Sequence, residues 1–72
     1  MKPITRQEKR ILELIGMGYS TRKIAVALEI SFHTVQSYRR SLLKKYGAAN
    51  SAELVRLAIV GNDLERLNPD LE

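Results

Sequence analysis

The strongest constraint on the fold lies in residues 21–40, TRKIAVALEISFHTVQSYRR, where small and apolar residues fall at the positions that two helices crossing through a tight turn require. The first helix must bury a short stripe, and one position in it must be small so that the second helix can approach closely. That stripe consists of Ile24, Ala25 and Leu28, with Ala25 as the small residue. Ile30 can fill the corner, and Ser31 is placed to accept a backbone N–H of the second helix. The pattern predicts a helix-turn-helix.

The turn between these helices is the least regular part of the pattern. Many helix-turn-helix units have glycine where this chain has Glu29. A residue other than glycine carries a steric penalty when its φ is positive. The sequence therefore leaves open whether the turn is of the usual left-handed type or of another type.

The second helix, predicted over residues 32–46, has two distinct faces when it is stepped at about 100° per residue. The inner arc holds Val35, Tyr38, Leu42 and Tyr46. The outer arc holds His33, Gln36, Ser37, Arg40 and Lys44. A surface helix with hydrogen-bond donors and no acidic residue on its outer face suits the major groove of B-DNA, which is surrounded by phosphates and lined by base edges. An ordinary three-helix core has the same periodicity, so the order of the pieces carries more weight than amphipathicity alone.

Length and composition exclude several classes of protein. At 72 residues the chain is one domain with little room for a catalytic cleft, and it has no cysteine and a single histidine. It also lacks a glycine-rich phosphate loop and a carboxylate pair of evident purpose, so we expect no enzymatic activity, no metal and no cofactor. No apolar run is long enough for a membrane span or a signal peptide, which makes a cytoplasmic location the expectation, with no membrane partner.

The charge of the chain is distributed unevenly. Residues 1–50 carry ten Lys and Arg against three acids, a net charge of +7, whereas residues 51–72 carry two Arg against five acids, a net charge of −3. The basic part is therefore also the part that contains the helix-turn-helix. This is the electrostatic footprint of a phosphate-binding face, although basic small domains that bind no nucleic acid are common.

A further helix precedes the helix-turn-helix. Thr5 and Glu8 have the spacing of a capping box at its start, and the glycines of residues 16–18 can close it. Ser20 then caps the first helix of the helix-turn-helix. The free backbone N–H groups at that helix start can hold a DNA phosphate, and basic side chains there add positive charge. The first turn contains Thr21, Arg22 and Lys23.

A last helix follows the predicted recognition helix. Asn50 and Glu53 repeat the capping-box spacing, and the helix runs to about Val60 with Gly61 as its stop. The residues expected to face the core are Leu54, Val55 and Ala58, and those nearer the other side are Ala52, Arg56 and Ile59.

A linked set of residues connects these elements to a known family. The set comprises Thr5 with Glu8, Gly18, Ser20, Ile24-Ala25, Leu28, Ile30-Ser31, Thr34-Val35, Lys45, Gly47 and Glu53. The stretch from Ile4 to Ala58, about three-quarters of the chain, resembles the DNA-binding domain of LuxR/FixJ-type bacterial transcription regulators. The resemblance implies an all-α fold of four helices without a wing, and we expect a DNA-binding domain over residues 1–62. The residues beyond it contain acids, Pro69 and only spaced leucines, which predicts a frayed or short helical tail over residues 63–72.

The resemblance also implies how such a domain works. It would regulate transcription by inserting helix 32–46 into the major groove of double-stranded DNA, as a weak homodimer that pairs through the last helix on a symmetric site. RNA polymerase is a further candidate partner. The expected base contacts, which the helical wheel also selects, are Gln36, Ser37 and Arg40. The expected backbone contacts are Thr21, Arg22, Lys23, Ser31, Thr34, Lys44 and Lys45, with His33 and Arg39 as further candidates. The expected dimer interface is Ala52, Arg56 and Ile59.

The chain departs from the family's pattern at three positions. Members usually have lysine at Gln36, histidine at Tyr38 and a basic residue at Ser51. Glutamine prefers adenine, whereas lysine reaches guanine or a phosphate, so Gln36 predicts a different sequence preference. Serine at position 51 removes one anchor on the DNA backbone.

Two other functions remain open on sequence grounds. One is a promoter-binding module like region 4 of sigma factors, which would act as part of polymerase. The other is a helical protein-interaction domain that has kept the scaffold without binding DNA. Salt dependence separates the second alternative, because DNA binding through several phosphates weakens steeply as salt rises.

Overall fold

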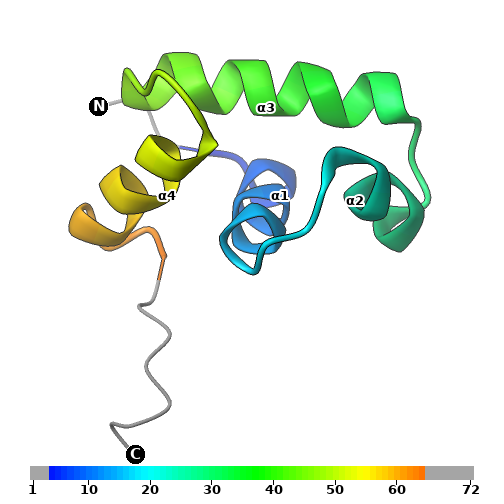
Figure 1. Cartoon of the computed structure of the whole chain (residues 1–72), viewed down its shortest axis with the longest axis horizontal. Helices are drawn as coiled ribbons and strands as arrows, with labels where there is room; N and C mark the ends of the chain where they lie inside the picture. Colours follow the sequence, from blue (N-terminus) through cyan, green and yellow to red (C-terminus); the bar gives the residue numbers. More distant parts are fainter. Residues whose placement is uncertain (1–3, 65–72) are drawn as a thin grey trace, which may run out of the picture.

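Four helices follow one another in the computed structural model, which describes residues 4–64. They are α1 (Arg6–Gly16), α2 (Thr21–Leu28), α3 (Phe32–Tyr46) and α4 (Ser51–Val60). Within the described residues there is no strand, so the all-α prediction is confirmed. The long helix α3 runs along one side of the molecule, and the other three helices lie on the same side of it (Figure 1). Each of them contacts α3, so this helix organises the domain.

Each helix begins at the residue that the capping pattern predicts. At α1, the Thr5 hydroxyl accepts the Glu8 N–H at 3.1 Å while the Glu8 carboxylate accepts the Thr5 N–H at 2.9 Å, which confirms the capping box. Ser20 and Ser31 cap α2 and α3 through the backbone N–H three residues on. The start of α4 differs in one detail. Asn50 accepts the N–H of Glu53, but the Glu53 carboxylate accepts from Ala49 instead of Asn50, so only half of the predicted box forms.

The helix ends depend on left-handed residues. Gly18, with φ +91°, follows α1, and Gly47, with φ +66°, closes α3. At the end of α4, Gly61 has an ordinary φ of −84°, and Asn62 is the left-handed residue instead, with φ 68°. Asparagine tolerates this region because its short polar side chain can hydrogen-bond locally.

The turn of the helix-turn-helix is of the usual left-handed type. Glu29, which ends α2, has φ 58° and ψ 43°, and its N–H bonds back to Val26 in the last turn of that helix. The chain therefore adopts the backbone that glycine would take without strain, and it does so with a side chain present. The open question about this turn is settled in favour of the common geometry, at a conformational cost of about 1 kcal/mol.

The hydrophobic core lies between α3 and the other helices. Its largest fully buried side chains are Ile11, Leu12, Ile24, Val35, Leu42 and Leu54. Ala25 is buried where α2 must approach α3, as predicted. Tyr38 and Tyr46 are partly buried and pack against this core, which confirms the predicted inner arc of α3.

The segment after α4 folds back onto the domain. Leu64 packs against the core, and the Tyr46 hydroxyl donates a hydrogen bond to the Asp63 carboxylate. Burial, reinforced by this hydrogen bond and charge, raises the pKa of Tyr46. Residues 63 and 64 belong to the segment predicted as a tail, and the rest of that tail, 65–72, lies outside the described residues.

Candidate nucleic-acid interface

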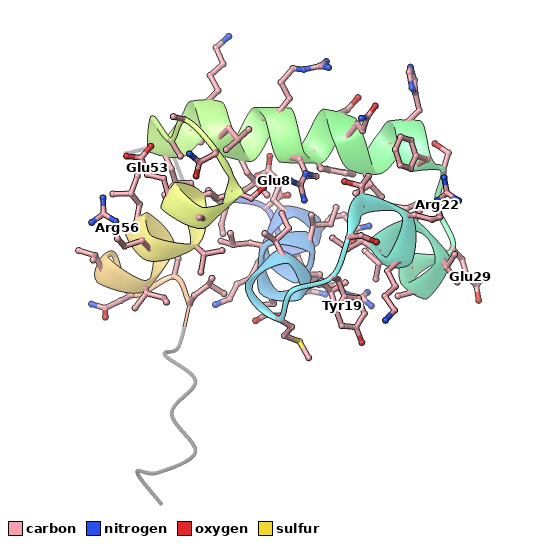
Figure 2. The ribbon with its side chains drawn as sticks, viewed as in Figure 1. Glu8, Tyr19, Arg22, Glu29, Glu53 and Arg56 are labelled. Atoms are coloured by element: carbon pink, nitrogen blue, oxygen red, sulfur yellow. The ribbon has the colours of Figure 1, made fainter. Side chains whose placement is uncertain are left out.

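The outer face of α3 is a continuous polar surface. Its members, His33, Gln36, Ser37, Arg40 and Lys44, are all exposed. Figure 2 shows long side chains projecting from the side of α3 that faces away from the other helices. No acidic residue occurs anywhere in α3. The three predicted base-contacting residues therefore share one accessible face with no carboxylate among them.

Burial of the opposite face fixes this orientation. Val35 and Leu42 are both 0% exposed, two turns apart on the inner side of α3. Rotating the helix would bring charged side chains into the core and expose these two apolar ones, at a cost of roughly 1.5–3 kcal/mol for each apolar side chain. The packing thus holds the polar face outward without help from a ligand.

One edge of α3 is tied to the start of α1. The Lys45 ammonium lies 2.6 Å from the Glu8 carboxylate, which also accepts the Ser41 hydroxyl at 3.2 Å. Glu8 is only 5% exposed. Burial alone would raise the pKa of Glu8, but the Lys45 ammonium, the Thr5 N–H and the Ser41 hydroxyl outweigh it and leave that pKa below its ordinary value.

This ion pair changes the interpretation of Lys45. The Lys45 side chain is 20% exposed and its ammonium binds Glu8 of α1, whereas the predicted partner of Lys45 is the DNA backbone. Its phosphate contact stays a prediction, but its ammonium also has a structural partner. From sequence alone, Glu8 is predicted only as a member of the capping box. A signal for its burial was present, since Glu8 lies one turn before Leu12 and shares its helix face.

The other edge of α3 is tied to the start of α4. The Arg39 guanidinium donates a hydrogen bond to the Ser51 hydroxyl, and Arg39 is half-buried. The sequence predicts Arg39 only as a further DNA candidate and Ser51 as the loss of an anchor on the DNA backbone. The structure brings these two residues together, so the positive charge of Arg39 lies beside the Ser51 hydroxyl.

The start of α2 presents its basic residues in different directions. Arg22 and Lys23 are exposed, and Thr21 is half-buried. The Lys23 ammonium lies 5.6 Å from the centroid of the Tyr19 ring. In Figure 2, Arg22 points toward the end of the molecule where α3 begins, whereas Tyr19 points away from α3. Arg22 is therefore directed toward the start of α3, and the Lys23 ammonium lies near the Tyr19 ring.

Two predicted backbone contacts lie at the start of α3. Ser31 and Thr34 are exposed, and their hydroxyl oxygens are 2.8 Å apart. The Ser31 hydroxyl also accepts the Thr34 N–H. These hydroxyls order the first turn of α3 while they remain accessible to solvent.

The predicted pairing surface lies on α4. Ala52 and Arg56 are exposed, and Ile59 is half-buried and lies outside the hydrophobic core cluster. Figure 2 shows Arg56 projecting from the side of α4 away from α1. Val60, which sequence reasoning did not single out for this surface, is 69% exposed and adds apolar area at the end of the helix.

The described residues offer little else for chemistry. Among residues 4–64, no cluster of His, Asp or Glu is suited to hold a metal ion. In the same range, every buried side-chain nitrogen or oxygen has a hydrogen-bond partner. None of the helices in this part of the chain has the length and apolarity needed to cross a membrane.

Comparison with known families gives a match over most of the chain. Residues 2–58 match the family described as bacterial regulatory proteins, luxR family. This range includes α1, α2, α3 and most of α4.

Curated proteins with similar sequences carry regulatory names. The transcriptional regulatory protein UhpA of Escherichia coli (strain K12) is 35% identical over 54 residues, which are 75% of this chain and 28% of UhpA. The transcriptional regulatory protein MctR of Rhizobium johnstonii is 40% identical over 57 residues, 79% of this chain and 27% of MctR. The chain thus spans little more than a quarter of the length of these relatives. Their names are not those of enzymes, in agreement with the expectation from composition.

Solved structures share the fold. A structure of the Vibrio cholerae VqmA dimer in the absence of target DNA superimposes with a TM-score of 0.83 at 30% identity, covering 88% of this chain and 28% of the VqmA chain. A VqmA–ligand–DNA complex superimposes with a TM-score of 0.82 at 28% identity, covering 99% of this chain and 31% of the VqmA chain.

Proposed function

The chain belongs to the luxR family of bacterial regulatory proteins, and from this membership we propose that it binds double-stranded DNA and regulates transcription by inserting α3 into the major groove. The observation that carries the proposal is the exposed, acid-free outer face of α3, which the core holds away from the other helices. A helix with such a face fits between phosphates and can donate to base edges. The regulators named among its relatives and the DNA complex of VqmA support the same function.

Three residues are assigned to reading bases. Gln36, Ser37 and Arg40 are exposed on the outer face. Arginine can pair in bidentate fashion with guanine, and glutamine with adenine, through the major-groove edges of these bases. Serine can hydrogen-bond to any base and contributes less discrimination.

The DNA backbone is assigned to the residues around this face. Arg22 points toward the end of the molecule where α3 begins (Figure 2), and Lys44 places a positive charge in the last turn of α3. The other proposed backbone contacts are Thr21, Lys23, Ser31, Thr34 and Lys45, with His33 and Arg39 as further candidates. These contacts fix the register on the duplex and carry no sequence information by themselves.

We further propose that two copies bind a symmetric site. The base-reading side chains of one α3 helix cover only a short half-site, and pairing doubles the length of sequence that is read. The proposed interface is the exposed side of α4, with Ala52, Arg56 and Ile59. We expect this surface to bury less than the about 1,200–2,000 Å² of stable interfaces, so that two copies pair on DNA and not off it. RNA polymerase as an additional partner, and a cytoplasmic location, belong to the same proposal.

Selection from a random DNA pool tests these assignments together. We expect an enriched consensus with two inverted half-sites, and affinity that falls steeply with salt. Arg40→Ala and Gln36→Ala should weaken binding to the consensus by roughly 1–3 kcal/mol while changing binding to random DNA much less.

Arg10→Ala is a matched control, because it removes the same charge from an exposed position of α1. Equal losses of affinity for the consensus site in Arg40→Ala and Arg10→Ala would contradict the assignment of Arg40 as a base reader. Failure of the pool to enrich any sequence would contradict sequence-specific binding, and binding to promoter DNA only in the presence of polymerase would favour a sigma-like role.

A further inference from the structure

Phe32 is an exposed apolar side chain at the start of α3. It is the first residue of α3 and is 46% exposed. It belongs neither to the buried core cluster nor to the partly buried side chains packed against it. Within the described residues, it is the one exposed large hydrophobic residue of α3. Single exposed hydrophobic residues are common on protein surfaces, so the place of Phe32 on α3, and not its exposure alone, points to a ligand.

The position of Phe32 places it beside the proposed base readers. Phe32 precedes Gln36 by four residues, which puts the two side chains one turn apart and about 40° apart around the helix axis. Val35 is about 60° from Phe32 in the other direction around the axis and is fully buried. Phe32 thus borders the outer face at the beginning of α3. In helix-turn-helix proteins this end of the recognition helix approaches base edges.

The chemistry of the major groove then selects the ligand. All five outer-face residues of α3 are polar, so none of them suits an apolar group in the groove. The only apolar group that a base pair presents there is the 5-methyl group of thymine, and phenylalanine is among the side chains that contact it. We propose that Phe32 packs against a thymine methyl group and thereby selects a T·A pair next to the base pair read by Gln36. This inference rests on the proposed function.

Pairing between protein copies does not account for Phe32. The proposed pairing surface is on α4, which lies under the end of α3 opposite to the one where Phe32 begins the helix (Figure 1). Phe32 is instead on the same helix as the base readers.

Removal of single methyl groups from the DNA tests the inference. Once the consensus site is known, each thymine of a half-site is replaced in turn by uracil, which keeps the hydrogen bonds and loses only the methyl group. Dissociation constants are measured for the wild type, Phe32→Ala and Gln36→Ala. At one position we expect uracil to weaken DNA binding by the wild type roughly three- to five-fold, which is the effect of losing the burial of about one methyl group. The ratio of the dissociation constants for the uracil site and the thymine site should be the same for Gln36→Ala as for the wild type. For Phe32→Ala this ratio should be about one.

Val26→Ala is the matched control, because Val26 is a 73% exposed apolar residue on α2. Its uracil ratios should equal those of the wild type. If Phe32→Ala keeps the full uracil effect at every position, or if no thymine in the half-site is sensitive, the inference is overturned. If the wild type binds no DNA, the proposed function fails and this inference with it.

A second measurement uses the unaltered protein and so does not depend on folding of a variant. Replacing the sensitive thymine by 5-iodouracil, whose iodine occupies the site of the methyl group, allows photocrosslinking to the side chain in contact. We expect the crosslink at Phe32. A crosslink at another residue, or none at any thymine position, would overturn the inference.

Discussion

Glu8 carries a negative charge into the core, and three donors hold it there. The pKa of Glu8 is lowered in the folded protein below the ordinary value of a glutamate. A lowered pKa means that the ionised carboxylate stabilises the fold above the unfolded pKa. This contribution is lost as the pH falls through the folded pKa.

We therefore expect Glu8→Gln to reduce the free energy of unfolding by about 1–3 kcal/mol at neutral pH, because Lys45 loses its charged partner. We also expect the variant to lose less stability than the wild type between about pH 5 and pH 3. Urea unfolding followed by circular dichroism at several pH values measures both effects. Glu13→Gln, an exposed position on the same helix, is the control and should change neither. The same acid sensitivity in wild type and Glu8→Gln would show that this carboxylate does not carry the linkage.

Glu29 holds a left-handed backbone without the freedom of glycine. We expect Glu29→Gly to raise stability by about 0.5–1 kcal/mol, because relief of strain exceeds the added entropy of the unfolded chain. In a domain of this size that corresponds to a rise of roughly 2–8 °C in Tm. Glu29→Ala keeps the Cβ atom and removes only the carboxylate, so its Tm should stay close to that of the wild type. If alanine stabilises as much as glycine, the carboxylate and not the backbone is the source of the cost.

At the scale of helices, the two neighbouring lysines near the end of α3 should behave differently. Lys44 is exposed on the outer face, whereas Lys45 pairs with Glu8. We expect Lys44→Ala to leave stability unchanged and to weaken binding to all DNA sequences alike, with the salt slope reduced by about one unit. Lys45→Ala should lower the free energy of unfolding, because Glu8 is left buried without its cation. Thermal melts and salt titrations of both variants check this, and identical profiles would contradict it.

The helices were predictable from sequence because their signals are local. Thr5, Ser20, Ser31 and Asn50 each act on a backbone N–H three residues away, so a short window contains the whole interaction. The faces of α3 followed from helical periodicity in the same way. The assignment of base readers on the outer face likewise needed only that periodicity and the resemblance, and it remains a prediction.

The contacts that brace α3 were not predictable, because they join residues far apart in the chain. The bond from Lys45 to Glu8 spans 37 residues, and the bond from Arg39 to Ser51 joins two different helices. A basic residue on a helix edge looks the same in sequence whether it faces a phosphate or a carboxylate of another helix. Packing decides between these partners, and packing depends on tertiary structure.

At the scale of the whole molecule, α4 is expected to join two copies on DNA. Ile59 is half-buried and outside the core, so Ile59→Glu should leave the fold and binding to a single half-site intact. It should abolish cooperative binding to the full site, because a glutamate facing its symmetry mate is costly to desolvate. Gel-shift titrations with one and two half-sites measure this. Met17→Glu is the control, since Met17 is 59% exposed at the end of α1. An unfolded Ile59→Glu variant would place this residue in the core, and unchanged cooperativity would place pairing elsewhere.

The contact between α3 and α4 has a consequence for the operator itself. Because Arg39 of α3 binds Ser51 of α4 and both helices share the hydrophobic core, we expect the proposed reading helix and the proposed pairing helix to move together. Two copies paired in this way fix the spacer between half-sites in both length and helical phase. One inserted base pair turns the second half-site by about 34° around the DNA axis, since B-DNA has about 10.5 base pairs per turn. Operators of this protein should therefore share one spacer length, while the bases within that spacer vary freely.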